Sequence, residues 1–96
     1  MARIRHMVFF SAKDEADVDR IVEGLSVLTR IPHAEVLEIR PNLRRDALGN
    51  EIDVVVYGEF ADEAALEAYK AHPLYQTSID VVRPLRELRF AADVAI

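Results

Sequence analysis

The chain has 96 residues, of which 51% are hydrophobic, and this predicts one small domain over residues 1–96. Seventeen acidic and twelve basic side chains give a net charge of -5, which excludes nucleic acid as an expected partner because nucleic acid is also anionic. The sequence has no cysteine, and this excludes disulfides, thiolate catalysis and cysteine metal sites. No apolar run approaches the roughly 18 residues of a membrane span, so we expect a cytoplasmic protein with no membrane partner.

The first two predicted elements are a strand over residues 4–10 and a helix from Asp14 to about Ile31. The strand is apolar at nearly every position, which indicates burial on both faces. Period-two alternation places Ile4, His6, Val8 and Phe10 on one face of this strand, and Met7 and Phe9 on the other. After Asp14, a suitable N-cap, apolar residues recur at helical spacing until Pro32 follows.

Four further elements are predicted in the rest of the chain. Val54, Val55, Val56 and Tyr57 again put large groups on both sides of a strand. The predicted ranges are a strand over 34–40 closed by Pro41, a polar connection over 42–51, a strand over 52–60, a helix from Asp62 to His72, a further helical turn or two up to Pro84, and a strand over 85–94.

The order strand, helix, strand, strand, helix, strand predicts a ferredoxin-like α+β fold. In this fold the helices cover one face of a four-stranded antiparallel sheet and leave the other face open. Two of the strands are apolar on both sides, so the open face must also be covered. A second copy of the same sheet is the economical cover, and we expect a homodimer through the open sheet face. The alternative is an unrelated partner packed on that face.

The segment from Tyr69 to Tyr75 places two phenols and an imidazole around a helix end. Pro73 has no N–H and disfavours helical geometry at the residue before it, so the helix should stop near His72. Tyr69 and His72 are three residues apart and therefore share a helix face. A helix end facing a sheet is a suitable place for polar groups over a cavity.

Together with His6 in the first strand, Phe60 before the helix and an apolar C-terminal strand, this segment resembles the Dabb family of stress-responsive dimeric A/B barrel domains. The resemblance extends from Ile4 to about Ala92. It implies that two sheets face each other in a dimeric α/β barrel, and that His6 looks into a cavity between the strand and the second helix.

The resemblance also implies a catalytic possibility, since the plant polyketide cyclases of the family use a tyrosine at the place of Tyr69 with a His-Pro-x-His motif. Here the motif begins with His72 and Pro73, but its second histidine is replaced by Tyr75. A further cavity histidine of those cyclases falls at Val54. Imidazole titrates near neutral pH whereas a phenol has a pKa of about 10, so Tyr75 is a poor general base.

Three functions remain open. The first is a stress-responsive homodimer that binds a small apolar or aromatic molecule between sheet and helices. The second is a cofactor-free polyketide cyclase, lyase or isomerase acting on a β-keto compound, and the third is a structural assembly module. The candidate catalytic residues are His6, Tyr69 and Tyr75, and the candidate ligand-binding residues are His6, Tyr57, Tyr69, His72 and Tyr75.

Three of the candidate residues have a purely structural interpretation as well. His6 on an apolar strand face is compatible with a packed side chain bonded to one partner, and Tyr69 with a core aromatic. His72 at a helix C-terminus is compatible with capping of free carbonyls. The three histidines lack metal-ligand spacing, and no phosphate loop or other cofactor motif is present, so we expect neither a metal nor a cofactor.

Overall fold

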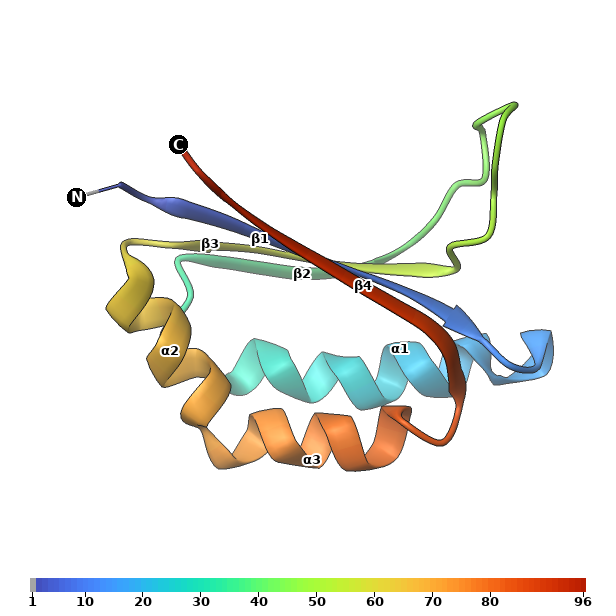
Figure 1. Cartoon of the computed structure of the whole chain (residues 1–96). Helices are drawn as coiled ribbons and strands as arrows, with labels where there is room; N and C mark the ends of the chain where they lie inside the picture. The colour runs from blue at the N-terminus through green and yellow to red at the C-terminus, as the bar shows by residue number, and fades with distance from the viewer. Residues whose placement is uncertain (1) are drawn as a thin grey trace.

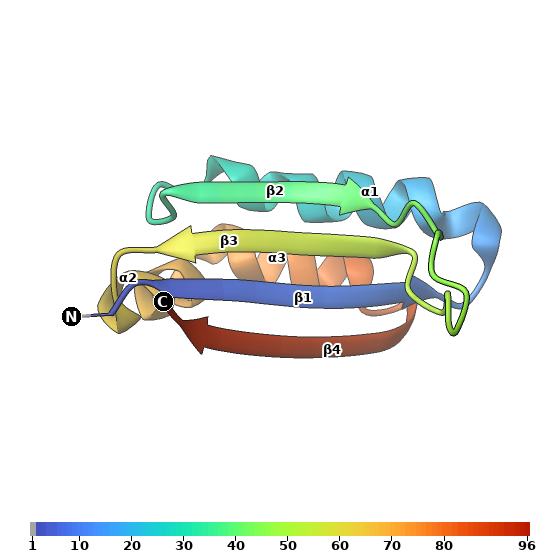
Figure 2. The same cartoon turned by 90° about the horizontal axis from the view of Figure 1, so that it is seen from above.

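The computed structural model describes residues 2–96, in which helices cover one face of a four-stranded sheet (Figure 1). The strands run antiparallel in the order β2-β3-β1-β4 (Figure 2), which confirms the predicted ferredoxin-like fold. The elements are β1 (Ile4–Ala12), α1 (Val18–Ser26), β2 (Val36–Pro41), β3 (Val54–Phe60), α2 (Glu63–Ala71), α3 (Pro73–Val82) and β4 (Arg86–Ala95), with short 3₁₀ helices at Glu15–Asp17 and Val27–Arg30.

The helices differ from prediction at their ends. The long helix predicted from Asp14 is α-helical only over α1 and is 3₁₀ on both sides. Asp14 caps the first 3₁₀ turn by accepting the N–H of Ala16, and the Ser26 hydroxyl donates to the carbonyl of Val22. Such bonds from short hydroxyl side chains compete with the helical backbone ladder, which is consistent with the tightening after Ser26.

The break at Pro73 starts a full helix rather than a turn or two. Pro73 occupies the first position of α3, where its missing N–H is not needed. The ring of His72 serves as the N-cap, with Nδ1 accepting the Leu74 N–H at 3.1 Å. The ring of His72 therefore caps the start of α3, with Nδ1 unprotonated in this bond, while the backbone N–H of His72 donates to the Tyr69 carbonyl at the end of α2.

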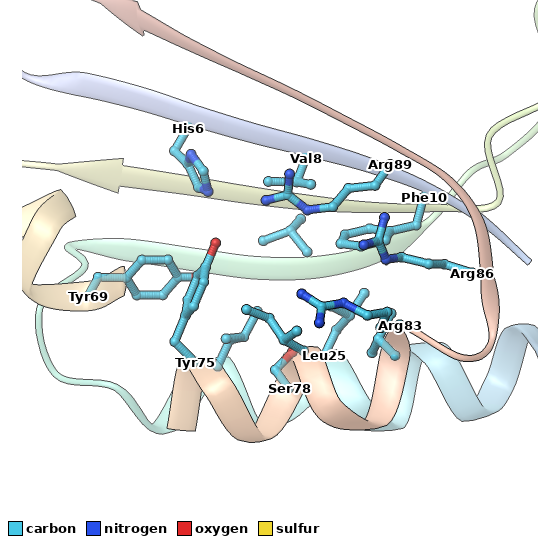
Figure 3. Close-up of a pocket in the computed structure, with 14 residues that line it drawn as sticks. His6, Val8, Phe10, Leu25, Tyr69, Tyr75, Ser78, Arg83, Arg86 and Arg89 are labelled. Atoms are coloured by element: carbon cyan, nitrogen blue, oxygen red, sulfur yellow. The ribbon is translucent and has the colours of Figure 1, made fainter. Parts of the chain in front are cut away.

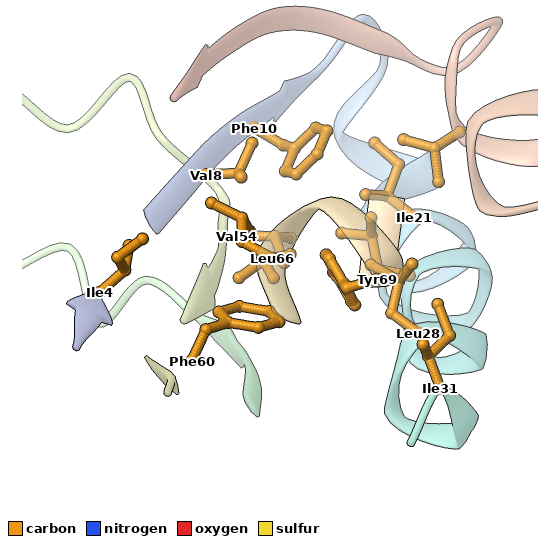
Figure 4. Close-up of a cluster of buried hydrophobic side chains, with 13 residues drawn as sticks. Ile4, Val8, Phe10, Ile21, Leu28, Ile31, Val54, Phe60, Leu66 and Tyr69 are labelled. Carbon is orange, nitrogen blue, oxygen red and sulfur yellow. The ribbon is translucent and has the colours of Figure 1, made fainter. Parts of the chain in front are cut away.

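The core lies between the sheet and the helices (Figure 4). The alternating burial of β1 and β3 places one face of each strand against α1, α2 and α3. Ring packing at one end joins Phe60 and Tyr69, whose centroids are 5.0 Å apart. The buried hydrophobic residues are Ile4, Val8, Phe10, Ile21, Leu25, Leu28, Ile31, Val54, Val56, Phe60, Leu66, Tyr69 and Val82.

Helices α1 and α3 approach closely at Gly24. A Cβ atom on Gly24 would lie 2.7 Å from Cγ1 of Val81 and 3.0 Å from Cγ2 of Val82, and both neighbours are β-branched and stiff at χ1. We expect Gly24→Ala to lower the free energy of unfolding by about 1–3 kcal/mol through overpacking, in spite of alanine's better helix propensity. Urea unfolding measures this, with exposed Glu23→Ala as the control; a Gly24→Ala protein at least as stable as wild type would contradict it.

The face of the sheet away from the helices carries an apolar band. In the strand register Phe9 lies opposite Phe90, and Met7 lies between Tyr57 and Ala92. Phe90 is 58% exposed and Val94 is 44% exposed in the single chain. The connection between β2 and β3, residues 42–53, rises on this same side of the sheet (Figure 1). The two-sided apolar character predicted for the central strands is thus present.

Candidate functional site

A cavity of about 170 Å³ lies between the sheet and helices α1 and α3 (Figure 3). A volume of roughly 150 Å³ in an apolar core suffices to bind benzene, so this cavity can hold a body of about one ring. Most of its wall is hydrocarbon, formed by Val8, Phe10, Leu25, Leu28, Val56, Ile79 and Val82. Its polar lining comes from His6, Tyr69, Tyr75, Ser78, Arg83, Arg86 and Arg89.

His6 reaches the cavity from the middle of β1 and is held there by Asp93. The two residues are direct partners in the antiparallel pairing of β1 with β4, and Nδ1 of His6 is 2.5 Å from Oδ1 of Asp93. A carboxylate accepts, so Nδ1 carries the proton of this bond, and in the neutral form of the ring Nε2 holds a free lone pair. His6 is only 1% exposed, and its Nε2 has no hydrogen-bond partner within residues 2–96.

Tyr69 and Tyr75 stand beside His6 and complete one end of the cavity (Figure 3). The centroid of Tyr69 is 6.0 Å from that of His6 and 5.3 Å from that of Tyr75, both in edge-on geometry. Burial, with a smaller contribution from Tyr75, raises the pKa of Tyr69 well above its usual value of 10.0. Tyr69 is therefore a neutral phenol at physiological pH, a group that donates a hydrogen bond or a proton.

The other end of the cavity is lined by three arginines (Figure 3). Arg83 follows the last turn of α3, and Arg86 and Arg89 come from β4. Burial, followed by the charges of Arg89 and Arg83, lowers the pKa of Arg86 below its usual value. The cavity is thus aromatic and neutral at one end and cationic at the other.

The prediction that Tyr57 lines the cavity is wrong. Val54 and Val56 face the helices and are buried, so alternation along β3 puts Tyr57 on the open face of the sheet. There its hydroxyl donates to Oε2 of Glu59 at 2.6 Å, and this bond to the carboxylate raises the pKa of Tyr57.

His72 also lies outside the cavity lining, although it was predicted to bind a ligand. Its ring is committed to the N-cap of α3 and packs edge-on with His33, at a centroid distance of 6.3 Å. The other predicted site residues do come together, because the structure places His6, Tyr69 and Tyr75 around the same cavity.

Residues 2–96 contain neither a candidate metal site nor a candidate membrane span. No three histidine, cysteine, aspartate or glutamate side chains in this range gather closely enough to hold a metal ion. No helix in the same range is long and apolar enough to cross a membrane.

The fold and the cavity define a ferredoxin-like α+β protein with a largely apolar pocket, carrying polar groups at both ends, between its sheet and its helices. Residues 4–96 match the family model described as Stress responsive A/B Barrel Domain, or Dabb, so the chain belongs to the Dabb family. This confirms the resemblance seen in the sequence. No curated protein is similar enough in sequence to count as a relative.

Solved structures share this fold over nearly the whole chain. A dimeric ferredoxin-like protein of unknown function from Thermobifida fusca has a TM-score of 0.82 and 24% identity, covering 99% of this chain and 92% of that one. A Dabb family protein from Mesorhizobium loti has a TM-score of 0.81 and 24% identity, covering 98% and 96%. A hydroxynitrile lyase from Passiflora edulis has a TM-score of 0.81 and 17% identity, covering 99% and 94%. At these identities the similarity establishes the fold.

Proposed function

We propose that this Dabb protein binds a small, largely apolar or aromatic molecule in the cavity between the sheet and the helices. The observation that carries the proposal is the buried Nε2 of His6, which faces the cavity without a partner among residues 2–96. A buried polar atom of this kind calls for an explanation, and a hydroxyl donor on a ligand supplies one. The hydrocarbon wall would then hold the body of the ligand.

We further propose that the protein acts as a homodimer through the open face of the sheet. The apolar band around Phe9 and Phe90 supports this, because a contiguous exposed patch of large apolar residues is typical of an interface. The dimeric description of similar structures supports it as well. The cavity opens on the helical side of the same sheet, so dimerisation on the other side leaves it accessible.

Titration with p-cresol, a single ring with one hydroxyl, tests the binding proposal. We expect saturable chemical-shift changes in amide NMR spectra that cluster at His6, Tyr69 and Tyr75. Ser78 is buried and lines the cavity, so Ser78→Leu should fill the space and weaken binding by about tenfold or more. Exposed Thr77→Leu is the matched control. Shift changes that do not saturate, or that persist unchanged in Ser78→Leu, would contradict the proposal.

A second candidate function is cofactor-free acid–base chemistry on a β-keto compound. The Asp93–His6 pair favours it, because the carboxylate holds the imidazole in the tautomer whose Nε2 is a base facing the cavity. In this proposal Nε2 takes a proton from the carbon between two carbonyls, and the enolate oxygen formed accepts a hydrogen bond from the Tyr69 hydroxyl. Reprotonation, ring closure or bond cleavage from that enolate corresponds to an isomerase, a cyclase or a lyase.

Two further considerations bear on this second candidate. The fold of a hydroxynitrile lyase is similar, which supports only the statement that such a scaffold can carry a lyase. The direct test is the exchange of the central CH₂ protons of ethyl acetoacetate with D₂O, because exchange reports proton abstraction alone.

The third function, a structural assembly module, has no observation in its favour.

A further inference from the structure

The cationic end of the cavity is a feature that the proposed function does not use. Arg83 projects from the end of α3, while Arg86 and Arg89 project from β4, so the guanidinium groups come from both walls of the cavity (Figure 3). Arg86 is half-buried, and Arg83 and Arg89 are exposed. An arginine trio at the mouth of an apolar cavity has the composition of an anion-binding site.

An irregularity in the sheet turns the side chains of two of these arginines toward the cavity. Arg86 and Arg89 are three residues apart, and in a regular strand they would point to opposite faces. In the pairing of β1 with β4, Phe10 lies opposite Arg89 and Ala12 lies opposite Arg86, so β4 has one extra residue in this interval. A bulge of this kind redirects a side chain, and here it turns both guanidinium groups toward the cavity.

Residues 2–96 provide no carboxylate partner for the three arginines. Across residues 2–96 no ion pair involves Arg83, Arg86 or Arg89, and no aspartate or glutamate of this range lines the cavity. Elsewhere among residues 2–96, Arg3 and Arg44 do form ion pairs with carboxylates, as expected for a chain of net charge -5. Like charges in a partly buried site repel one another, and a bound anion relieves that repulsion.

We propose that the cavity takes the anion of a small organic acid, with a body of about one ring against the hydrocarbon wall and a carboxylate at Arg83, Arg86 and Arg89. The inference rests on the proposed binding function and names the class of ligand. The volume of about 170 Å³ sets the size of the body. The planar fork of arginine matches a carboxylate in two parallel hydrogen bonds, which a point charge does not do. A hydroxyl at the far side of the ring would then face Nε2 of His6.

The test compares two ligands that differ in one group. In p-cresol and 4-hydroxybenzoate the ring and the hydroxyl are the same, and a methyl group is exchanged for a carboxylate. We expect 4-hydroxybenzoate to bind at least about tenfold more tightly, since hydrogen bonds to a charged group are the strong ones. Dissociation constants come from the same amide NMR titrations, in low-salt buffer to limit screening.

Single substitutions assign the effect to the arginines. Arg86→Gln and Arg89→Gln should each reduce the affinity for 4-hydroxybenzoate by about tenfold while leaving the affinity for p-cresol within about twofold. Arg89→Lys retains the charge and loses the fork, so its loss should be smaller. Arg30→Gln changes the net charge equally on an exposed helical surface and should change neither affinity. Circular dichroism checks that each variant is folded.

Each outcome distinguishes this inference from the binding proposal. If p-cresol binds in the cavity and 4-hydroxybenzoate binds no more tightly, the acid assignment is overturned and the binding proposal stands. If neither ligand binds there, both are overturned. Equal losses in Arg30→Gln and Arg89→Gln would mean a general charge effect and would also overturn the assignment. If 4-hydroxyphenyl phosphate binds more tightly than 4-hydroxybenzoate, the assignment of a carboxylate is overturned in favour of a phosphate ester.

Discussion

Replacing His6 by glutamine is expected to lower the exchange rate of ethyl acetoacetate in D₂O by about 10²–10⁴-fold, if the acid–base function holds. The reason is the loss of Nε2 of His6, an imidazole nitrogen that faces the cavity without a hydrogen-bond partner among residues 2–96. A glutamine amide fills similar space but has no basic lone pair at neutral pH. Proton NMR follows the CH₂ signal, and the rate in buffer alone is subtracted.

The matched control for this experiment is His33→Gln, because His33 is exposed and lies beside His72 outside the cavity lining. Asp93→Asn removes the charge behind the imidazole and should give an intermediate loss, since the hydrogen bond to Nδ1 can still form. Equal rates for wild type and His6→Gln would exclude His6 as the base. A wild-type rate no faster than buffer would contradict catalysis and leave the binding proposal in place.

The fold was largely predictable from the sequence because its main signals are local. Apolar residues on both sides of 4–10 and 54–57 indicated strands with two buried faces, and these strands, β1 and β3, form the central pair of the sheet. The change to helical spacing after Asp14 marked the first helical region. Pro73 was read as a helix end, yet α3 follows directly, since proline is compatible with the first helical position as well as with a stop.

Of the site, the sequence predicted only residues whose position follows from their own strand or helix. His6 and Tyr69 were identified by residue type and by position within their own strand or helix. Asp93 was missed because its partnership with His6 depends on the register between β1 and β4, which lie at opposite ends of the chain. Counting two residues at a time from Val54, where the cyclases have a cavity histidine, excludes Tyr57 from the cavity, and this parity signal was present in the sequence.

The arginines could not be assigned by such counting. Regular alternation separates Arg86 from Arg89, and only the bulge opposite Phe10 and Ala12 brings both to one side. No residue in this stretch marks a bulge by itself, since glycine is absent from 86–95. The cationic character of the cavity is therefore a property of the sheet irregularity and had no signature in the sequence pattern.

Replacing Phe90 by aspartate is expected to convert the proposed homodimer to monomer. Phe90 is 58% exposed in the single chain and lies opposite Phe9 in the middle of the apolar band. In the proposed dimer a carboxylate at this place would be buried without a partner between the two sheets. Sedimentation velocity measures the mass, expected as twice 10.9 kDa for wild type and 10.9 kDa for the variant.

The control places the same charge on the helical side of the molecule, where exposed Thr77→Asp should leave the dimer intact. A Phe90→Asp protein that remains dimeric would contradict the open-face interface, and a monomeric Thr77→Asp protein would move the interface to the helices. The proposed dimer interface and the cavity share β4, which presents Phe90 to one side and Arg89 to the other. In a single protomer β4 is an edge strand with one neighbour, β1, so contact with a second sheet through Phe90 would also steady the strand that carries Asp93, Arg86 and Arg89.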